Sequence, residues 1–190
     1  NQTFIITVTN PAPIARDDAA STGENVDIAG SVFADNGNGA DSDPDGDTIV
    51  VSAVNGVAGN VGASIAGSAG GRFVIGTDGS YSFVPGADFD NLKAGQQRTT
   101  SITYTISDGQ GGTSTATFRV TVSGANDLPV GSDIAVSTAE DTALSGQLPA
   151  ATDVDGDPLT YGVGSQPGHG SVTIDPTGAY VYTPTADFNG

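Results

Sequence analysis

Carboxylates at alternating positions around a glycine form the chemically most suggestive pattern in this sequence. Residues 41–47 carry four aspartates in seven positions, and residues 153–157 carry three in five. A short loop of this kind can turn several carboxylate oxygens toward one point, where they would repel one another without a cation. Calcium accepts six to eight oxygen ligands at about 2.3–2.6 Å and tolerates irregular geometry, whereas magnesium requires a tighter octahedron. The pattern predicts calcium loops with the candidate ligands Asp43, Asp45, Asp47, Asp153, Asp155 and Asp157.

The same loop sequences are compatible with two other interpretations. The first loop begins like an EF-hand, D-x-D-x-D-G, but the twelfth position is Ser52 rather than a bidentate glutamate and the flanking segments have strand patterns. An EF-hand is therefore excluded. Asp and Gly also build tight hairpin turns with no metal at all. This second interpretation stays open for any single loop, although the recurrence of the pattern weakens it.

The overall charge excludes several classes of function. The chain of 190 residues has 22 acidic and 5 basic side chains, for a net charge of −17. It has no basic surface to neutralise phosphates, so neither nucleic acid nor an anionic membrane surface is expected as a partner. No run of 18 apolar residues is present, so no membrane insertion is expected. Cysteine is absent, which excludes disulfides and zinc–thiolate sites. An acidic excess of this size predicts that cations offset the self-repulsion of the folded state.

The acidic loops recur because the chain contains an internal repeat. Residues pair at an offset of 116 near the start of the repeat, then at 110 after one insertion, and at 99 after a second one. The pairs include Glu24 with Glu140, Asp43 with Asp153, and Asp88 with Asp187. We predict a first repeat at residues 11–125 and a C-terminally truncated second repeat at 126–190, which lacks a counterpart to residues 91–123.

The pattern around the loops is β throughout. Period-two alternation of β-branched and aromatic residues predicts strands, at residues 3–9, 49–53, 80–84, 101–106, 115–122, 159–163, 171–174 and 179–183. About seven short strands in 110 residues favour an all-β fold of tandem Greek-key, immunoglobulin-like β-sandwich modules. The insertions near residues 35–42 and 54–71 are expected to be surface loops of low order.

The first ten residues read as the last strand of a preceding repeat. Thr3 and Phe4 match Thr117 and Phe118, and the pair at residues 7–8 matches that at 121–122. A second possibility is that this strand fills the vacant edge of the truncated repeat in the same chain, but its tether would have to pass the whole first module.

The residues around the second loop carry a family resemblance. The segment A-T-D-V-D-G-D-P-L-T-Y at 151–161 resembles the calcium-binding Asp-x-Asp segment of cadherin repeats, and N-D-L-P at 126–129 resembles their linker. The segment Y-T-I-S-D-G-Q-G-G-T at 104–113 resembles bacterial cadherin-like and VCBS-type tandem repeats of large secreted adhesins and surface proteins. The Asp-Arg-Glu motif of cadherins is missing, and residues 87–90 are an approximate counterpart.

The resemblance implies a set of calcium ligands. A site at the junction of the repeats would collect Glu24, Asp88, Asn126, Asp127, Asp153 and Asp155, with Asp157 either a further ligand or a turn former. The corresponding cluster at the start of the first repeat would use Asp43, Asp45 and Asp108, and Glu140 matches the lone glutamate of the first strand.

The function implied is mechanical. Calcium shared across a linker would turn a hinge into a stiff joint of an extracellular extender or adhesion module on a bacterial surface, with neighbouring repeats, and a cell-surface glycan or protein, as partners. The alternative is a carbohydrate-binding accessory module of a secreted polysaccharide-active protein, with the five tyrosines as stacking groups. An enzyme is not expected, because the one histidine, His169, has Gly70 as its counterpart and no site that would raise a carboxyl pKa is evident.

Overall fold

The computed structural model describes residues 3–4 and 9–188. It divides into two compact units, here called unit 1 (Asn1–Asn126) and unit 2 (Asp127–Gly190). Within the described residues, no helix has the length and apolar character needed to cross a membrane.

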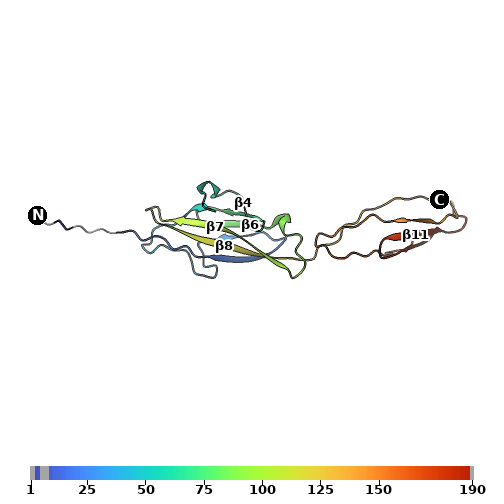
Figure 1. Cartoon of the computed structure of the whole chain (residues 1–190), viewed down its shortest axis with the longest axis horizontal. Coiled ribbons are helices and arrows are strands. Elements are labelled where there is room, and N and C mark those ends of the chain that lie inside the picture. The colour runs from blue at the N-terminus through green and yellow to red at the C-terminus, as the bar shows by residue number, and fades with distance from the viewer. Residues whose placement is uncertain (1–2, 5–8, 189–190) are drawn as a thin grey trace. The chain divides into compact units, whose positions relative to one another are not determined.

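Unit 1 is a sandwich of two four-stranded sheets (Figure 1). One sheet has the order β1-β8-β7-β3, formed by β1 (Asp18–Gly23), β8 (Thr113–Ser123), β7 (Gln97–Ser107) and β3 (Val50–Val54). The other has the order β2-β6-β5-β4, formed by β2 (Ile28–Ser31), β6 (Ser80–Val84), β5 (Arg72–Ile75) and β4 (Ile65–Ala66). All pairings are antiparallel except that of β1 with β8, which is parallel over six residue pairs. The predicted immunoglobulin-like β-sandwich is confirmed.

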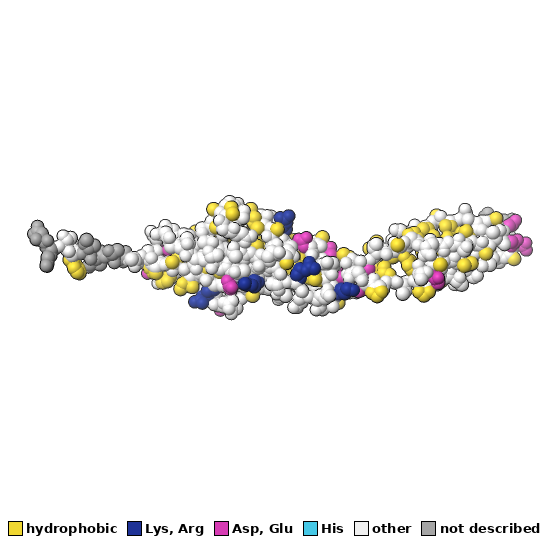
Figure 2. All heavy atoms as spheres, viewed as in Figure 1, with side chains coloured by type: hydrophobic (Ala, Val, Ile, Leu, Met, Phe, Trp, Pro, Cys, Tyr) yellow, Lys and Arg dark blue, Asp and Glu magenta, His cyan; other side chains and the backbone are white. Residues whose placement is uncertain are grey.

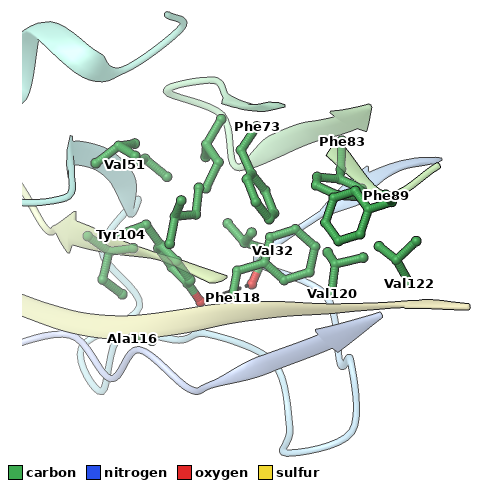
Figure 3. Packing of buried hydrophobic residues seen from close by; sticks show 14 of the residues in the cluster. Val32, Val51, Phe73, Phe83, Phe89, Tyr104, Ala116, Phe118, Val120 and Val122 are labelled. Atoms are coloured by element: carbon green, nitrogen blue, oxygen red, sulfur yellow. Dashed lines mark hydrogen bonds between the residues drawn. The ribbon is translucent and has the colours of Figure 1, made fainter. Parts of the chain in front are cut away.

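The core of unit 1 follows from the alternation along its two longest strands. Every second residue is buried from Thr100 onward in β7 and from Ala116 onward in β8, including Phe118, Val120 and Val122, which are all 0% exposed. They face Phe73 and Phe83 of the opposite sheet, with the Phe73 and Phe118 ring centroids 5.7 Å apart (Figure 3). Burial of each such side chain contributes about 1.5–3 kcal/mol, so this cluster holds the two sheets together.

Unit 2 has one three-stranded sheet, in the order β10-β11-β9. Its strands are β9 (Leu144–Gln147), β10 (Gly170–Ile174) and β11 (Ala179–Pro184). By the repeat offsets, these match β2, β5 and β6 of unit 1 in both position and sheet order. The match extends to a glycine–tyrosine pair: Gly30 lies opposite Tyr81, and Gly146 lies opposite Tyr180. A Cβ on Gly146 would lie 2.5 Å from the Tyr180 hydroxyl, so each ring covers the glycine across from it.

The strand predicted at residues 159–163 is wrong, because the structure has no strand there. Its counterpart in unit 1 is β3, which pairs with β7, and unit 2 has no counterpart to β7. The segment of unit 2 that matches β1, residues 134–139, has no strand either, since its partner would be the equally missing counterpart of β8. Period-two alternation shows which face a strand would bury, but a strand also needs a neighbour for its backbone hydrogen bonds.

Two other predicted segments precede or fall within the sandwich in the sequence. The strand predicted at residues 3–9 lies mostly outside the described residues. The insertion at residues 54–71 is more regular than expected, because it contains the short helix η1 (Ala58–Asn60) and β4. A further short helix, η2 (Gly86–Asp88), follows β6.

Candidate metal centre

Each acidic loop is held beside a linker by a two-residue clamp. In unit 1, Ile14 and Ser42 exchange both backbone hydrogen bonds, at 2.8 and 3.1 Å. In unit 2, Val130 and Thr152 do the same, at 2.7 and 2.9 Å. The paired residues correspond to each other in the repeat, and each clamp ends one residue before the Asp-x-Asp pattern begins. The clamp therefore fixes where the loop starts in both units.

The turn that follows is the same in both loops. The Gly46 amide donates to the Asp43 carbonyl, and the Gly156 amide donates to the Asp153 carbonyl, both at 3.1 Å. The two glycines have φ of +81° and +69°, a conformation that side chains with a Cβ rarely adopt. The amide two residues after the second aspartate of each loop closes the turn: that of Asp47 donates to Asp43 Oδ1 at 3.3 Å, and that of Asp157 donates to Asp153 Oδ1 at 3.1 Å.

In unit 2 this turn gathers three carboxylates. Oxygens of Asp153, Asp155 and Asp157 lie within 4.8 Å of one another, which among the described residues is the one such acidic trio. Asp155 is buried, and its Oδ2 accepts a 2.8 Å hydrogen bond from the Asp127 amide. In unit 1 the counterpart of Asp127 is Pro11, which has no amide to donate. The residue of unit 1 that corresponds to Asp155 is Asp45, and it is exposed.

Glu24 is anchored in a similar way at the end of β1. It is 2% exposed, and its Oε1 accepts a 2.7 Å hydrogen bond from the Ala125 amide. Its own amide donates to the Ser123 carbonyl at the end of β8. The parallel pairing of β1 and β8 therefore brings a glutamate near the start of the repeat to the residue that precedes Asn126.

Three carboxylate oxygens in the described part of the chain are buried without any hydrogen-bond partner. They are Glu24 Oε2, Asp43 Oδ2 and Asp155 Oδ1. In each of these residues the other oxygen is held by a backbone amide. A buried charged oxygen without a partner costs free energy, and native proteins almost always satisfy such groups. All three residues are among the predicted ligands.

Asp108 lies in the loop between β7 and β8 and is 5% exposed. Its Oδ1 accepts hydrogen bonds from the Gln110 and Gly112 amides, and its Oδ2 accepts one from Asn10 Nδ2 at 2.8 Å. Sequence reasoning did not include Asn10. The signal was present, because Asn10 lies 116 positions before Asn126, which was a predicted ligand.

The side chains of the remaining predicted ligands differ in exposure. Asp88 is exposed at the end of η2, and its Oδ2 accepts a 2.8 Å hydrogen bond from the Gly71 amide. Glu140 and Asn126 are exposed, and Asp127 is partly buried. Among the described residues, the one acidic cluster includes neither Asp88 nor Glu140, so both stay predictions.

Asp18 and Asp41 form a buried acidic pair at the start of the first loop, and sequence reasoning missed it. The Tyr104 hydroxyl lies 2.7 Å from Asp18 Oδ2 and 2.9 Å from Asp41 Oδ2. A phenol has one proton, so it can donate to only one of them, and the other short contact needs a proton on the carboxyl. Burial raises the pKa of both Asp18 and Asp41 above the usual value, which agrees with a carboxyl that holds a proton.

The donor set is suited to a hard cation. Every candidate ligand offers oxygen, from carboxylates or from the amide of an asparagine, and the described residues near the loops offer no imidazole or thiolate. Calcium prefers such oxygen ligands, whereas zinc and copper prefer nitrogen and sulfur.

The fold and the acidic loops define a class: an immunoglobulin-like sandwich with carboxylates at its linkers. Residues 10–124 match the family model described as a bacterial cadherin-like domain. The chain belongs to this family. Residues 126–190 match the model described as a bacterial Ig domain. Domains of these two kinds are typically structural and adhesion modules rather than enzymes. The curated proteins contain no match to the chain.

Solved structures similar to the chain are extracellular cadherin domains. Domains 1–5 of protocadherin gamma B2 align over 95% of this chain and 33% of that chain, at 16% identity and a TM-score of 0.46. Domains 3–6 of the same protein align over 94% of this chain and 46% of that chain, at 20% identity and a TM-score of 0.38. The chain thus spans between a third and a half of the length of these relatives.

Proposed function

We propose that this chain is a calcium-binding extender of an extracellular bacterial protein, in which calcium stiffens the joint between tandem modules. Support comes from the family match and from one observation above all: Glu24, Asp43 and Asp155 each bury an oxygen without a partner. A calcium ion would supply the partner that each oxygen lacks. The VCBS-type and adhesin context, and location on the bacterial surface, are part of the proposal.

The linker ties two of these residues to neighbouring points of the chain. Glu24 accepts its hydrogen bond from Ala125, and Asp155 accepts its own from Asp127. Residues two apart in sequence have Cα atoms at most about 7.6 Å apart. The two anchors are therefore neighbours along the chain, and we propose one ion shared across the linker, with Asn126 between the anchors as a further oxygen ligand. Binding would replace repulsion between carboxylates with attraction to a common cation.

The expected affinity is that of a weak extracellular site. Extracellular calcium modules have dissociation constants of about 10⁻⁴–10⁻³ M. At millimolar calcium, each site would then stabilise the folded state by about 0.5–1.5 kcal/mol. Several calcium sites at one joint would together provide enough free energy to favour one orientation of the linker over many.

Isothermal titration calorimetry tests the binding. The wild-type chain should take up calcium at millimolar concentration, and Asp153→Ala should lose at least one site. Asp133→Ala is the matched control, because it removes the same charge at an exposed position outside the loops. If the wild type shows no heat of binding, or if the control loses as much as Asp153→Ala, the proposal fails.

Small-angle X-ray scattering tests the mechanical role. The maximum dimension and its spread should change between EDTA and calcium for the wild type and should stay the same for Asp153→Ala. Calorimetric binding with identical scattering profiles would keep calcium as a ligand and would refute its role as a stiffener.

A further inference from the structure

Seven Asn-Gly or Asp-Gly pairs lie in the described part of the chain, and at each one the glycine nitrogen could attack the preceding side chain. The pairs are Asn-Gly at 36–37, 38–39 and 55–56, and Asp-Gly at 45–46, 78–79, 108–109 and 155–156. A further Asn-Gly pair, at 189–190, lies outside the described residues. The attack closes a five-membered succinimide ring, and glycine permits it most readily because it has no Cβ to obstruct the ring.

Six of the seven glycine amides donate a hydrogen bond that an attack would have to break. The partners are a carbonyl three residues earlier for Gly46, Gly79 and Gly156, and a side-chain oxygen for Gly109, Gly37 and Gly39. The amide of Gly56 is the one without a partner among the described residues. Its nitrogen is therefore the one that can approach the preceding side chain without first losing a contact.

The two Asn-Gly pairs at 36–39 are held doubly. Asp35 Oδ1 accepts from both glycine amides, at 3.0 and 2.9 Å, and these bonds hold the pKa of Asp35 below its usual value. A carboxylate here also opposes the negative charge that a glycine nitrogen must acquire before it attacks. The two asparagine side chains are fixed by their Nδ2 atoms, which donate to Asp18 Oδ1 at 2.8 Å and to the Asp17 carbonyl at 2.7 Å.

Asn55 and Gly56 are the central residues of the turn that ends β3. Val54 and Val57 exchange backbone hydrogen bonds at 3.2 and 3.0 Å, and the two central residues have φ of +48° and +74°, as a type I′ turn requires. Both central residues are exposed. Residues 54–71 contain no charged side chain, and Figure 2 shows hydrophobic and other uncharged groups where this segment projects from unit 1 beside β4. No carboxylate of the segment opposes an attack by the Gly56 nitrogen.

The Asn55 side chain is held by the oxygen at which charge would develop. Its Oδ1 accepts a 2.9 Å hydrogen bond from the Thr103 amide, with the Thr103 hydroxyl at 3.4 Å. Its Nδ2 has no hydrogen-bond partner among the residues that the structure describes. Donors placed at an oxygen that becomes an oxyanion stabilise the tetrahedral intermediate, and an amino group that nothing holds can leave as ammonia. At positions 36 and 38 the amino group is instead the atom that is fixed.

We propose that Asn55 and Gly56 form a self-modification site, at which unit 1 converts Asn55 to isoaspartate and aspartate without an enzyme. The Gly56 nitrogen loses its proton and bonds to Asn55 Cγ, the Cγ–Nδ2 bond breaks, and the amino group takes up that proton and leaves as ammonia. One water molecule then opens the succinimide ring. Opening at the side-chain carbonyl gives aspartate, and opening at the main-chain carbonyl gives isoaspartate, in which the chain continues through the side chain.

The product changes the edge of the sheet that contains β3 and β7. Asn55 extends the pairing of these strands by one residue, because its amide donates to the Thr103 carbonyl at 2.8 Å while its side chain accepts from the Thr103 amide. Isoaspartate adds a methylene to the main chain at this point and displaces that acceptor, and either product adds the first negative charge to residues 54–71. The site therefore records the age of unit 1 as an irreversible change at this edge, independently of the calcium loops.

Peptide mapping of aged protein tests the proposal. A protease that cleaves after aspartate and glutamate releases Asn55 in the peptide 48–78 and the other two asparagines in the peptide 36–41. After incubation in EDTA at mildly alkaline pH, Asn55 should be converted at least about tenfold faster than Asn36 and Asn38, since attack at either of those first breaks a hydrogen bond to a carboxylate. The isoaspartyl peptide should be present, because direct hydrolysis of the amide gives aspartate alone. Equal rates at the three sites, or aspartate without isoaspartate, overturns the proposal.

Urea and one substitution separate the effect of structure from that of sequence. In urea the three Asn-Gly pairs lose their contacts and should convert at similar rates. In the native protein, Asp35→Ala should raise the rates at Asn36 and Asn38 and leave that at Asn55 unchanged. Asp27→Ala is the matched control, because Asp27 is an exposed carboxylate outside this loop. If Asp35→Ala raises neither rate, a free glycine amide does not select Asn55 and the proposal fails.

The change at the sheet edge has its own measurement. The Thr103 amide donates to Asn55 Oδ1, so its hydrogen exchange should be slow in fresh protein and faster in the isolated isoaspartate form. Asn55→Gln is the control, because glutamine would have to close a larger ring, and position 55 of this variant should stay unconverted over the same period. Unchanged exchange of the Thr103 amide in the isoaspartate form would overturn the effect proposed for the edge.

Discussion

The two units contain the same acidic loop on very different cores. In unit 1 the sheets bury four phenylalanines and a tyrosine at 0% exposure. In unit 2, Tyr180 is the one hydrophobic side chain counted as buried among the described residues, at 8% exposure. Unit 2 keeps the sheet that matches β2, β5 and β6 and lacks the strands that match β7 and β8.

The loops are nevertheless built alike. The clamp, the turn and the glycine with positive φ recur in both units with nearly the same distances. The geometry of the loop is therefore set by local backbone hydrogen bonds and by the linker, and it does not require the second sheet. One difference between them is a proline: Pro11 in unit 1 stands where unit 2 has the Asp127 amide.

The largest expected effect comes from removing one core side chain in each unit and comparing the losses of stability. Phe118→Ala should lower the free energy of unfolding of unit 1 by about 3–5 kcal/mol. The Phe118 ring packs between Phe73 and Tyr81, and its removal leaves a cavity. Tyr180→Ala should destabilise unit 2 by less than half as much, since its surroundings are open. Urea unfolding followed by NMR resonances of each unit measures both. Equal losses would show that unit 2 has a closed core in solution.

A smaller effect is expected on calcium affinity when matching aspartates of the two loops are substituted. Asp155→Asn should weaken calcium binding at its loop about tenfold, which is about 1.4 kcal/mol, because it removes a charge from a buried and anchored ligand. Asp45→Asn, at the matching position, should weaken binding less, since Asp45 is exposed. Calorimetric titration of both variants compares them directly. An equal or larger loss for Asp45→Asn would contradict the role given to the Asp127 amide.

The smallest effect concerns the buried pair in unit 1. Desolvation raises the pKa of Asp41 in the folded state above 3.8. The Asp41 carboxyl therefore contributes its full stabilisation at pH values below its pKa in the unfolded chain. This stabilisation is lost as the pH rises through the pKa of Asp41 in the folded protein. Asp41→Asn can still accept from the Arg16 amide and can donate to Tyr104, so it should be about 1 kcal/mol more stable than wild type at pH 7 and equal to it near pH 4.

Thermal unfolding in EDTA across this range measures the difference and keeps the calcium loop out of the comparison. Asp17→Asn is the control, because the Asp17 side chain is 51% exposed and pairs with Arg119. If the advantage of Asp41→Asn is independent of pH, the carboxyl is not protonated in the folded protein.

Part of the fold was predictable from the alternation of residues along the strands. Alternation located β3, β6, β7 and β8 in unit 1 and β10 and β11 in unit 2. Period-two alternation missed β1, β2, β4, β5 and β9. It also predicted a strand at 159–163 that has no neighbour. A single-sequence pattern describes a strand's faces but contains nothing about whether its partner exists.

The candidate site was predictable by residue type but not by contact. Aspartates at alternating positions marked Asp43 and Asp155, and the repeated glutamate marked Glu24. Which oxygen lacks a partner depends on which backbone amide holds the other one. For Asp43 that amide lies within the same loop, but for Glu24 and Asp155 it comes from a linker residue 101 or 28 positions away. Asn10 and the Asp18–Tyr104–Asp41 contacts depend on the same long-range pairing, so local spacing did not reveal them.

The parallel pairing of β1 with β8 also has a consequence for a protein that is pulled. The chain enters unit 1 through β1 and leaves through β8, and the two strands lie side by side over six residue pairs. Tension on the two ends draws these strands past each other along their length, so it loads the whole ladder in shear and does not unzip one bond at a time. Rupture then requires several backbone hydrogen bonds to break together, which slows forced unfolding, a process governed by the unfolding rate rather than by equilibrium stability.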